Sequence, residues 1–133
     1  MEGLHIIKRI SSDARPSERA EQIALHEWCK AKRLNSFAIP NGGSRHKLEA
    51  ANMKREGVTS GVSDYCVILD HVVLFIEMKK RAKILKTGQR SISGLNISDN
   101  QYTFLTKVNK TDVCTGIVAY GAKEAIEFIE RNL

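Results

Sequence analysis

The chain has 133 residues, 42% of them hydrophobic and 27% charged, which predicts one globular domain over 1–133 with an N-terminal extension over 1–15, and it contains no repeats or low-complexity tracts. No apolar run reaches the roughly 18 residues of a membrane span, and no signal-peptide pattern opens the chain. Three widely spaced cysteines argue against a disulfide framework and a Cys-x-x-Cys zinc site. We therefore expect a cytoplasmic protein with buried free thiols and no membrane partner. The net charge of +6 and the isoelectric point of about 9.4 favour a polyanionic partner.

The first predicted element is a helix that begins after Ser17. This residue is a typical N-cap followed by acidic residues in the first turn, and apolar residues at helical spacing, Ile23 among them, continue the helix to about Arg33. Patterns of the same kind predict the remaining elements: a strand over 36–39, a loop over 40–45, a helix over about 47–56, strands over 64–69 and 72–79, a basic loop over 81–96, a helix from Ser98, a strand over 113–120 and a helix from Gly121 to about Asn132.

The order of these elements, αβαββαβα, predicts an α/β fold in which helices flank a central mixed sheet. The two middle strands form an antiparallel hairpin. The last strand follows a helix, so we expect it to run parallel to its neighbour. In the third helix, Tyr102 and Phe104 are predicted to pack against the sheet.

The register of the hairpin can be counted from the sequence. Only two residues separate the strands over 64–69 and 72–79, and counting outward from that loop places Asp64 directly opposite Glu77. Lys79 lies two residues further along and shares the same face. A one-residue bulge in the loop would move Asp64 off this face.

Two carboxylates at one point repel each other unless a cation lies between them or one is protonated. A metal held by Asp64, Glu77 and the main-chain carbonyl of Met78 would have oxygen ligands only, which suits Mg²⁺ or Mn²⁺. Such an ion activates water and stabilises charge during phosphoryl chemistry, with Lys79 beside the water. The alternative is that Asp64 and Glu77 are surface residues and that Lys79 forms a local ion pair with them.

Five short motifs occur in an order that resembles the virus-type replication–repair (VRR-NUC) nucleases of the PD-(D/E)xK superfamily. They are Glu18-x-x-x-Gln22, the 38–43 segment Ala-Ile-Pro-Asn-Gly-Gly, Gly57-Val-x-x-Gly61-Val-Ser-Asp64, Phe75-Ile-Glu-Met-Lys79 and Ser98-x-x-Gln101. The resemblance spans about residues 17–133 and implies the restriction-endonuclease-like fold of a stand-alone phage or bacterial domain. It further implies Mg²⁺- or Mn²⁺-dependent DNA cleavage, with Asp64 and Glu77 as metal ligands and Lys79 as the catalytic lysine.

The same resemblance assigns two more residues to the site. Glu18 becomes the acid that completes the metal site from the first helix, often through water, although Glu21, one turn away, competes with it. Gln101 becomes the polar residue that helps to orient the site. One position departs from the family pattern, because the family has proline where this chain has Ser63.

Basic residues follow the predicted site closely and have no acidic residue among them. This basic run consists of Lys79, Lys80, Arg81, Lys83, Lys86 and Arg90. It is either a solvated surface or, next to a metal site, a binding surface for phosphates. We also expect DNA contacts from the glycine-rich loop, whose backbone N–H groups can approach phosphate: Asn41, Gly42, Gly43 and Arg45.

The sequence therefore predicts a metal-dependent DNA endonuclease, structure-selective for branched or four-way-junction DNA in replication, repair or recombination. We expect a homodimer, because two-fold symmetry places two sites on opposite strands of a junction. A restriction-type or nicking nuclease acting on duplex DNA is the alternative, and a non-catalytic nucleic-acid-binding module is a second one.

Overall fold

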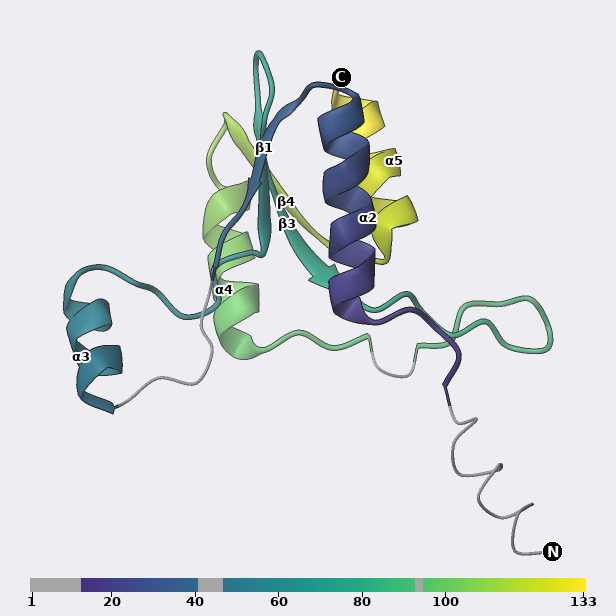
Figure 1. Cartoon of the computed structure of the whole chain (residues 1–133), viewed down its shortest axis with the longest axis horizontal. Helices are drawn as coiled ribbons and strands as arrows, with labels where there is room; N and C mark the ends of the chain where they lie inside the picture. Colours follow the sequence, from purple (N-terminus) through teal and green to yellow (C-terminus); the bar gives the residue numbers. More distant parts are fainter. Residues whose placement is uncertain (1–12, 41–46, 93–94) are drawn as a thin grey trace, which may run out of the picture.

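The computed structural model describes residues 13–40, 47–92 and 95–133, and its elements follow the predicted order (Figure 1). These elements are α2 (Glu18–Ala31), β1 (Asn35–Ala38), α3 (Lys47–Arg55), β2 (Tyr65–Ile68), β3 (Val73–Lys79), α4 (Asp99–Asn109), β4 (Cys114–Tyr120) and α5 (Ala122–Asn132). Two of the predicted caps are confirmed. The Ser17 side chain accepts a hydrogen bond from the Ala20 N–H, and Ser98 forms a capping box with Gln101.

The four strands form one mixed sheet in the order β1-β2-β3-β4. Strand β2 pairs antiparallel with both β1 and β3, whereas β4 pairs parallel to β3 after the chain has crossed over through α4. The predicted α/β fold class and the predicted strand directions are therefore confirmed.

The register of the β2–β3 hairpin is the one that the sequence predicts. Tyr65 lies opposite Ile76, and the Leu69 N–H donates to the Val72 carbonyl at 2.9 Å, so the loop has two residues and no bulge. Asp64, directly before β2, is consequently level with Glu77.

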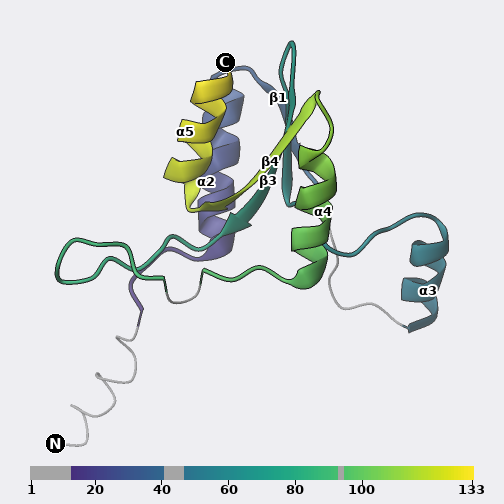
Figure 2. The ribbon, with the colours of Figure 1, turned by 180° about the vertical axis from the view of Figure 1, so that it is seen from behind.

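Helices cover the two faces of the sheet unequally. Helices α2 and α5 pack against each other and against one face, and α4 packs against β3 and β4 on the other face (Figures 1 and 2). The core between α2, α5 and the sheet is built from fully buried apolar side chains such as Leu25, Cys29, Leu74, Ile76, Met78 and Ile129. On the other face, α4 contacts only β3 and β4 within the described chain. The part over β1 and β2, called the open face below, leaves Phe37 and Ile68 partly exposed, whereas Cys66 beside them is buried.

Two apolar residues expected in the core lie instead at the surface. Ile23 is 52% exposed and Tyr102 is 65% exposed, because the buried stripes of their helices are narrower than the apolar pattern suggests. Phe104, by contrast, meets Phe75 of β3 edge to face. The cysteines are free as predicted, and two of the three are buried. In the described ranges, no helix has the length and apolar character needed to cross a membrane.

The elements that position the site meet at one end of the sheet. The carboxyl end of β3 lies there, beside the amino ends of α2 and α4 (Figure 1). Two projections extend from this end of the sheet on opposite sides of the molecule (Figures 1 and 2). One is α3, which packs against no other helix or strand of the described chain, and the other is a hairpin formed by residues 83–91.

Candidate active site

The acid pair lies near the carboxyl end of β3. Glu77 is 2% exposed, and Asp64 Oδ2 accepts a hydrogen bond from the Met78 N–H at 2.9 Å, which holds Asp64 against β3. No group in the described chain donates to Glu77 Oε1. Burial, and then the neighbouring Asp64, raise the pKa of Glu77 from 4.5 to about 8, with Lys79 acting in the opposite direction. At neutral pH this site therefore takes up a proton or another cation.

Gln101 joins the acid pair from the first turn of α4. Its Oε1 accepts from the Ser98 N–H at 2.9 Å, as the capping box requires. That contact turns the amide nitrogen toward the sheet, where it donates to Glu77 Oε2 at 3.1 Å. The helix cap thus also orients a polar group of the site, and the structure brings Gln101 to the place that the sequence predicts.

Lys79 completes the face shared with Glu77. Its Nζ lies 3.9 Å from Glu77 Oε2 and donates to Gln101 Oε1 at 3.3 Å. The side chain is 21% exposed, so the ammonium group reaches the surface while it contacts the buried acid. The cation is positioned by two partners and remains accessible to a substrate.

The structure separates the roles of the two acids on α2. Glu18 lines a cavity of about 240 Å³ together with Lys79, and its negative charge contributes to the raised pKa of Glu77. Glu21 is buried and already fully engaged by Arg81 and by the amino end of α5. Glu18 is therefore the acid of α2 that faces the site.

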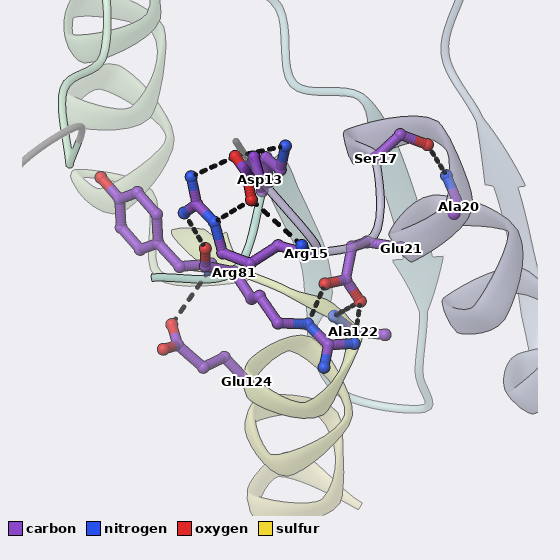
Figure 3. A network of polar contacts seen from close by, with 10 residues as sticks. Asp13, Arg15, Ser17, Ala20, Glu21, Arg81, Ala122 and Glu124 are labelled. Atoms are coloured by element: carbon purple, nitrogen blue, oxygen red, sulfur yellow. Dashed lines mark hydrogen bonds and ion pairs between the residues drawn. The ribbon is translucent and has the colours of Figure 1, made fainter. Parts of the chain in front are cut away.

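The Glu21–Arg81 pair joins α2 to the segment directly after β3 (Figure 3). Arg81 contacts both carboxylate oxygens, at 2.6 Å and 3.1 Å, and Glu21 Oε1 also accepts from the Ala122 N–H at 3.3 Å. Gly121 has a φ of +103°, and a Cβ there would lie 3.0 Å from the Arg81 side chain. Its N–H donates to the Lys79 carbonyl at 3.0 Å, so this contact holds the main chain at Lys79.

A second contact, between Gly61 and Asn100, positions α4. A Cβ at Gly61 would come within 2.3 Å of the Asn100 backbone, and the Asn100 side chain donates to Ser60 Oγ at 2.9 Å. Asn100 directly precedes Gln101, so the segment before β2 sets the place of a site residue. Nothing in the sequence assigns this role to Asn100, because the contact joins positions that are distant in the chain.

Half of the predicted basic run has acidic partners from other parts of the chain. Lys80 pairs with Asp13 at 2.9 Å, Arg81 with Glu21 and Arg90 with Glu124 at 3.2 Å. The absence of acids within the run therefore does not mean that its members lack acidic partners, and DNA binding by these residues stays a prediction. Lys83 and Lys86 are exposed on the 83–91 hairpin. The predicted DNA contacts Asn41, Gly42, Gly43 and Arg45 lie outside the described residues.

Arg15 is a residue near the site that the sequence reasoning missed. Its guanidinium donates to the Arg81 carbonyl at 2.6 Å and to Asp13 (Figure 3), and Asp13 in turn holds Lys80. The N-terminal segment is thereby tied to the chain directly after β3. No local pattern around Arg15 indicates this contact.

The donor atoms of the acid pair fit a small divalent cation. Asp64 and Glu77 offer carboxylate oxygens, and the unpartnered Glu77 Oε1 is a buried acceptor that an ion would satisfy. In the part of the chain that the structure describes, no three His, Cys, Asp or Glu side chains lie close enough together to hold a metal ion by themselves. Mg²⁺ does not require such a cage, since one or two carboxylates with water and substrate phosphate suffice.

Comparisons with known proteins bear on the fold. No family model and no curated protein matches the sequence. A solved structure described as "VRR_NUC domain protein" superposes with a TM-score of 0.65 over 87% of this chain and 87% of that one, at 21% sequence identity. A likeness at this identity concerns the fold, and it confirms the fold that the ordered motifs predict.

Proposed function

We propose that this chain, which has the fold of a VRR-NUC domain, is a metal-dependent endonuclease that hydrolyses phosphodiester bonds in branched DNA. The observation that carries the proposal is the buried Glu77 carboxyl, placed against Asp64 and beside Lys79. Burying an acid whose Oε1 has no donor in the described chain is costly. An acid with a strongly raised pKa next to a cation that reaches the surface is typical of a catalytic site.

The cofactor that fits these donors is Mg²⁺ or Mn²⁺. Asp64, Glu77 and the Met78 carbonyl would hold the ion, and Glu18 would contribute through a water molecule. When bound, such an ion supplies a water of lowered pKa and positive charge beside the scissile phosphate.

The protein's own groups have separate tasks in this reaction. The Lys79 ammonium lies at the surface of the site, where it orients the attacking water and adds positive charge near the phosphate. Gln101 fixes the Glu77 carboxylate through one hydrogen bond and Lys79 through another. Both hydrogen bonds are present before any substrate binds, so the site is preorganised.

We place the DNA across the end of the sheet at which β3 terminates. Lys83 and Lys86 stand on the 83–91 hairpin, next to the cavity that Lys79 and Glu18 line. These cations, and Lys80 where DNA phosphate replaces Asp13, would neutralise backbone phosphates, and Arg90 would add positive charge while it keeps its contact with Glu124. Arg81 contributes mainly through its bond to the buried Glu21.

We also propose that two copies of the chain associate through the open face of β1 and β2. Phe37 and Ile68 are 44% and 40% exposed there, on the side of the sheet that α4 leaves uncovered. A two-fold dimer would present two sites to a symmetric junction. Sedimentation velocity should show a dimer for the wild type and a monomer for Phe37→Ser, and a wild-type monomer at micromolar concentration would contradict this association.

The nuclease proposal is tested by a cleavage panel of single-stranded, duplex, flap and four-way-junction DNA with Mg²⁺ and with Mn²⁺. We expect cleavage only with metal, and fastest on the branched substrates. Asp64→Asn should lower the rate at least about a thousandfold. Asp112→Asn, which removes an exposed acid beyond α4, is the matched control and should cleave like the wild type.

The outcomes of the panel separate the candidate functions. Equal rates on duplex and junction DNA would favour the restriction-type or nicking alternative. Tight DNA binding without cleavage of any substrate would favour the non-catalytic module. Cleavage that survives Asp64→Asn would contradict the assignment of the metal site.

A further inference from the structure

The 83–91 hairpin has a defined shape and stands away from the body of the protein (Figures 1 and 2). An antiparallel bridge joins Ile84 to Arg90, and the Ser91 N–H donates to the Lys83 carbonyl at 2.8 Å. At the tip, the Leu85 N–H donates to the Gln89 carbonyl at 2.7 Å. These contacts make the projection a short two-stranded hairpin with internal hydrogen bonds.

The base of this hairpin is fixed to the body at several points. On the outgoing side, Arg81 is bonded to the buried Glu21, and its carbonyl accepts from Arg15 (Figure 3). On the returning side, Arg90 lies over the Tyr120 ring at 4.8 Å and pairs with Glu124. Both sides of the hairpin are therefore attached to the body at their base, close to Lys79.

The side chains of the hairpin combine two chemical characters. Ile84 is 68% exposed and Leu85 is 48% exposed, so both present apolar surface to the solvent. Lys83 and Lys86 flank them in the sequence. Isolated apolar residues at a surface need no explanation, but two adjacent ones on an anchored projection beside a catalytic site, with a lysine on each side, indicate a contact with a ligand that is both apolar and anionic.

Nucleic acid with unpaired bases has this combination of properties. DNA-binding proteins insert Leu or Ile side chains between base steps, which partly unstacks the bases, while basic residues contact the adjacent phosphates. Unstacking costs least where bases are already unpaired, so such a wedge favours a branch point over continuous duplex.

We propose that the 83–91 hairpin is a wedge that inserts Leu85 and Ile84 at the branch point of the DNA and thereby selects branched substrates. The wedge rests on the proposed nuclease function, whose substrate class it defines. Since Lys79 lies at the end of β3 and only three residues separate it from Lys83, the wedge would open the branch directly beside the bond to be cut.

The test measures base unstacking rather than cleavage. All proteins carry Glu77→Gln and are kept in EDTA, and the probe is a four-way junction with 2-aminopurine at the branch point, compared with a linear duplex carrying it at the same position. Binding should raise the fluorescence of the junction and leave that of the duplex nearly unchanged. Adding Leu85→Ser should remove most of the rise and weaken junction binding about tenfold, with duplex binding nearly unchanged.

Two further variants serve as controls. Leu85→Met keeps an apolar side chain and should retain the fluorescence rise. Val113→Ser changes a side chain that is 58% exposed and lies next to the start of β4, at the end of the sheet opposite the site. This variant should behave like the parent protein.

The wedge would be overturned if Leu85→Ser and Val113→Ser gave the same fluorescence and the same junction affinity. It would also be overturned if Leu85→Ser converted a dimer to a monomer in sedimentation, since the tip would then be a contact between copies. Wild-type cleavage is measured separately. Its absence would count against the nuclease proposal, while the unstacking signal, which needs no cleavage, would still decide the wedge.

Discussion

Replacing Glu77 with glutamine should stabilise the metal-free protein at pH 8 and leave its stability at pH 5 almost unchanged. Burial, and then Asp64, raise the pKa of Glu77 from 4.5 to about 8, so the folded protein holds this proton more tightly than the unfolded chain does. Between these pH values the folded state binds more protons. The free energy of unfolding therefore falls as the pH rises from about 4.5 to 8.

The magnitude of this effect follows from the same interval. At about 1.4 kcal/mol for each pH unit, full ionisation of Glu77 costs up to about 5 kcal/mol, a large part of the 5–15 kcal/mol that is typical, as an order of magnitude, of small domains. Glutamine resembles the protonated acid, because its oxygen can still accept from Gln101 and its amide nitrogen can donate to Asp64. The variant therefore lacks this pH-dependent penalty.

Urea unfolding of the wild type and of Glu77→Gln, from pH 5 to pH 8 in EDTA, measures the effect. The difference between the two proteins cancels the other titrating groups and should grow with pH in favour of the variant. Mg²⁺ should recover much of the wild-type stability at pH 8 and have little effect on the variant, because only the folded wild type binds it. Parallel curves within about 1 kcal/mol would refute the buried acid pair as the source of the raised pKa.

Three further changes test other parts of the account. Arg81→Met leaves the buried Glu21 with only the Ala122 N–H and should lower stability in urea unfolding. Lys80→Met breaks an exposed pair and should lower it much less; equal losses would contradict the role of the Glu21–Arg81 pair. Lys86→Ala should lower the slope of log Kd against log salt for junction DNA by about 0.9, the value for one lost phosphate contact; an unchanged slope would remove Lys86 from the DNA surface. Gly61→Ala should displace the first turn of α4 and lower kcat with little change in DNA affinity, and wild-type kcat would show that this contact does not position the site.

The centre of the site could be predicted because it depends on local geometry. A two-residue loop and the alternation of side chains along two strands determine that Asp64 and Glu77 face each other and that Lys79 shares their face. Gln101 is assigned to the site by the resemblance, through the motif Ser98-x-x-Gln101, and the capping box supplies the physical reason why these two residues lie within one helical turn. These relations span few residues, and no other part of the fold could change them.

The surroundings of the site could not be predicted, because they depend on contacts between distant segments. Glu21 and Arg81 are 60 positions apart, so the sequence favours Glu18 over Glu21 only through the family motif, and the contact of Glu21 with Arg81 becomes visible only in the fold. The acidic partners of Lys80 and Arg90 are also distant in the sequence, so the sequence does not show that these two basic residues are paired. The open face of β1 and β2 also escaped prediction, since sequence periodicity marks apolar side chains and not which helix covers them.

The central claim is that the buried acid pair serves metal-dependent cleavage of DNA. A single-turnover assay with labelled four-way-junction DNA, excess protein and either Mg²⁺ or EDTA tests it most directly, with the wild type and Glu77→Gln side by side. We predict cleavage by the wild type with Mg²⁺ alone, and for Glu77→Gln a rate at least about a thousandfold lower with junction binding retained. Cleavage by Glu77→Gln at the wild-type rate, or by the wild type in EDTA, would contradict the claim.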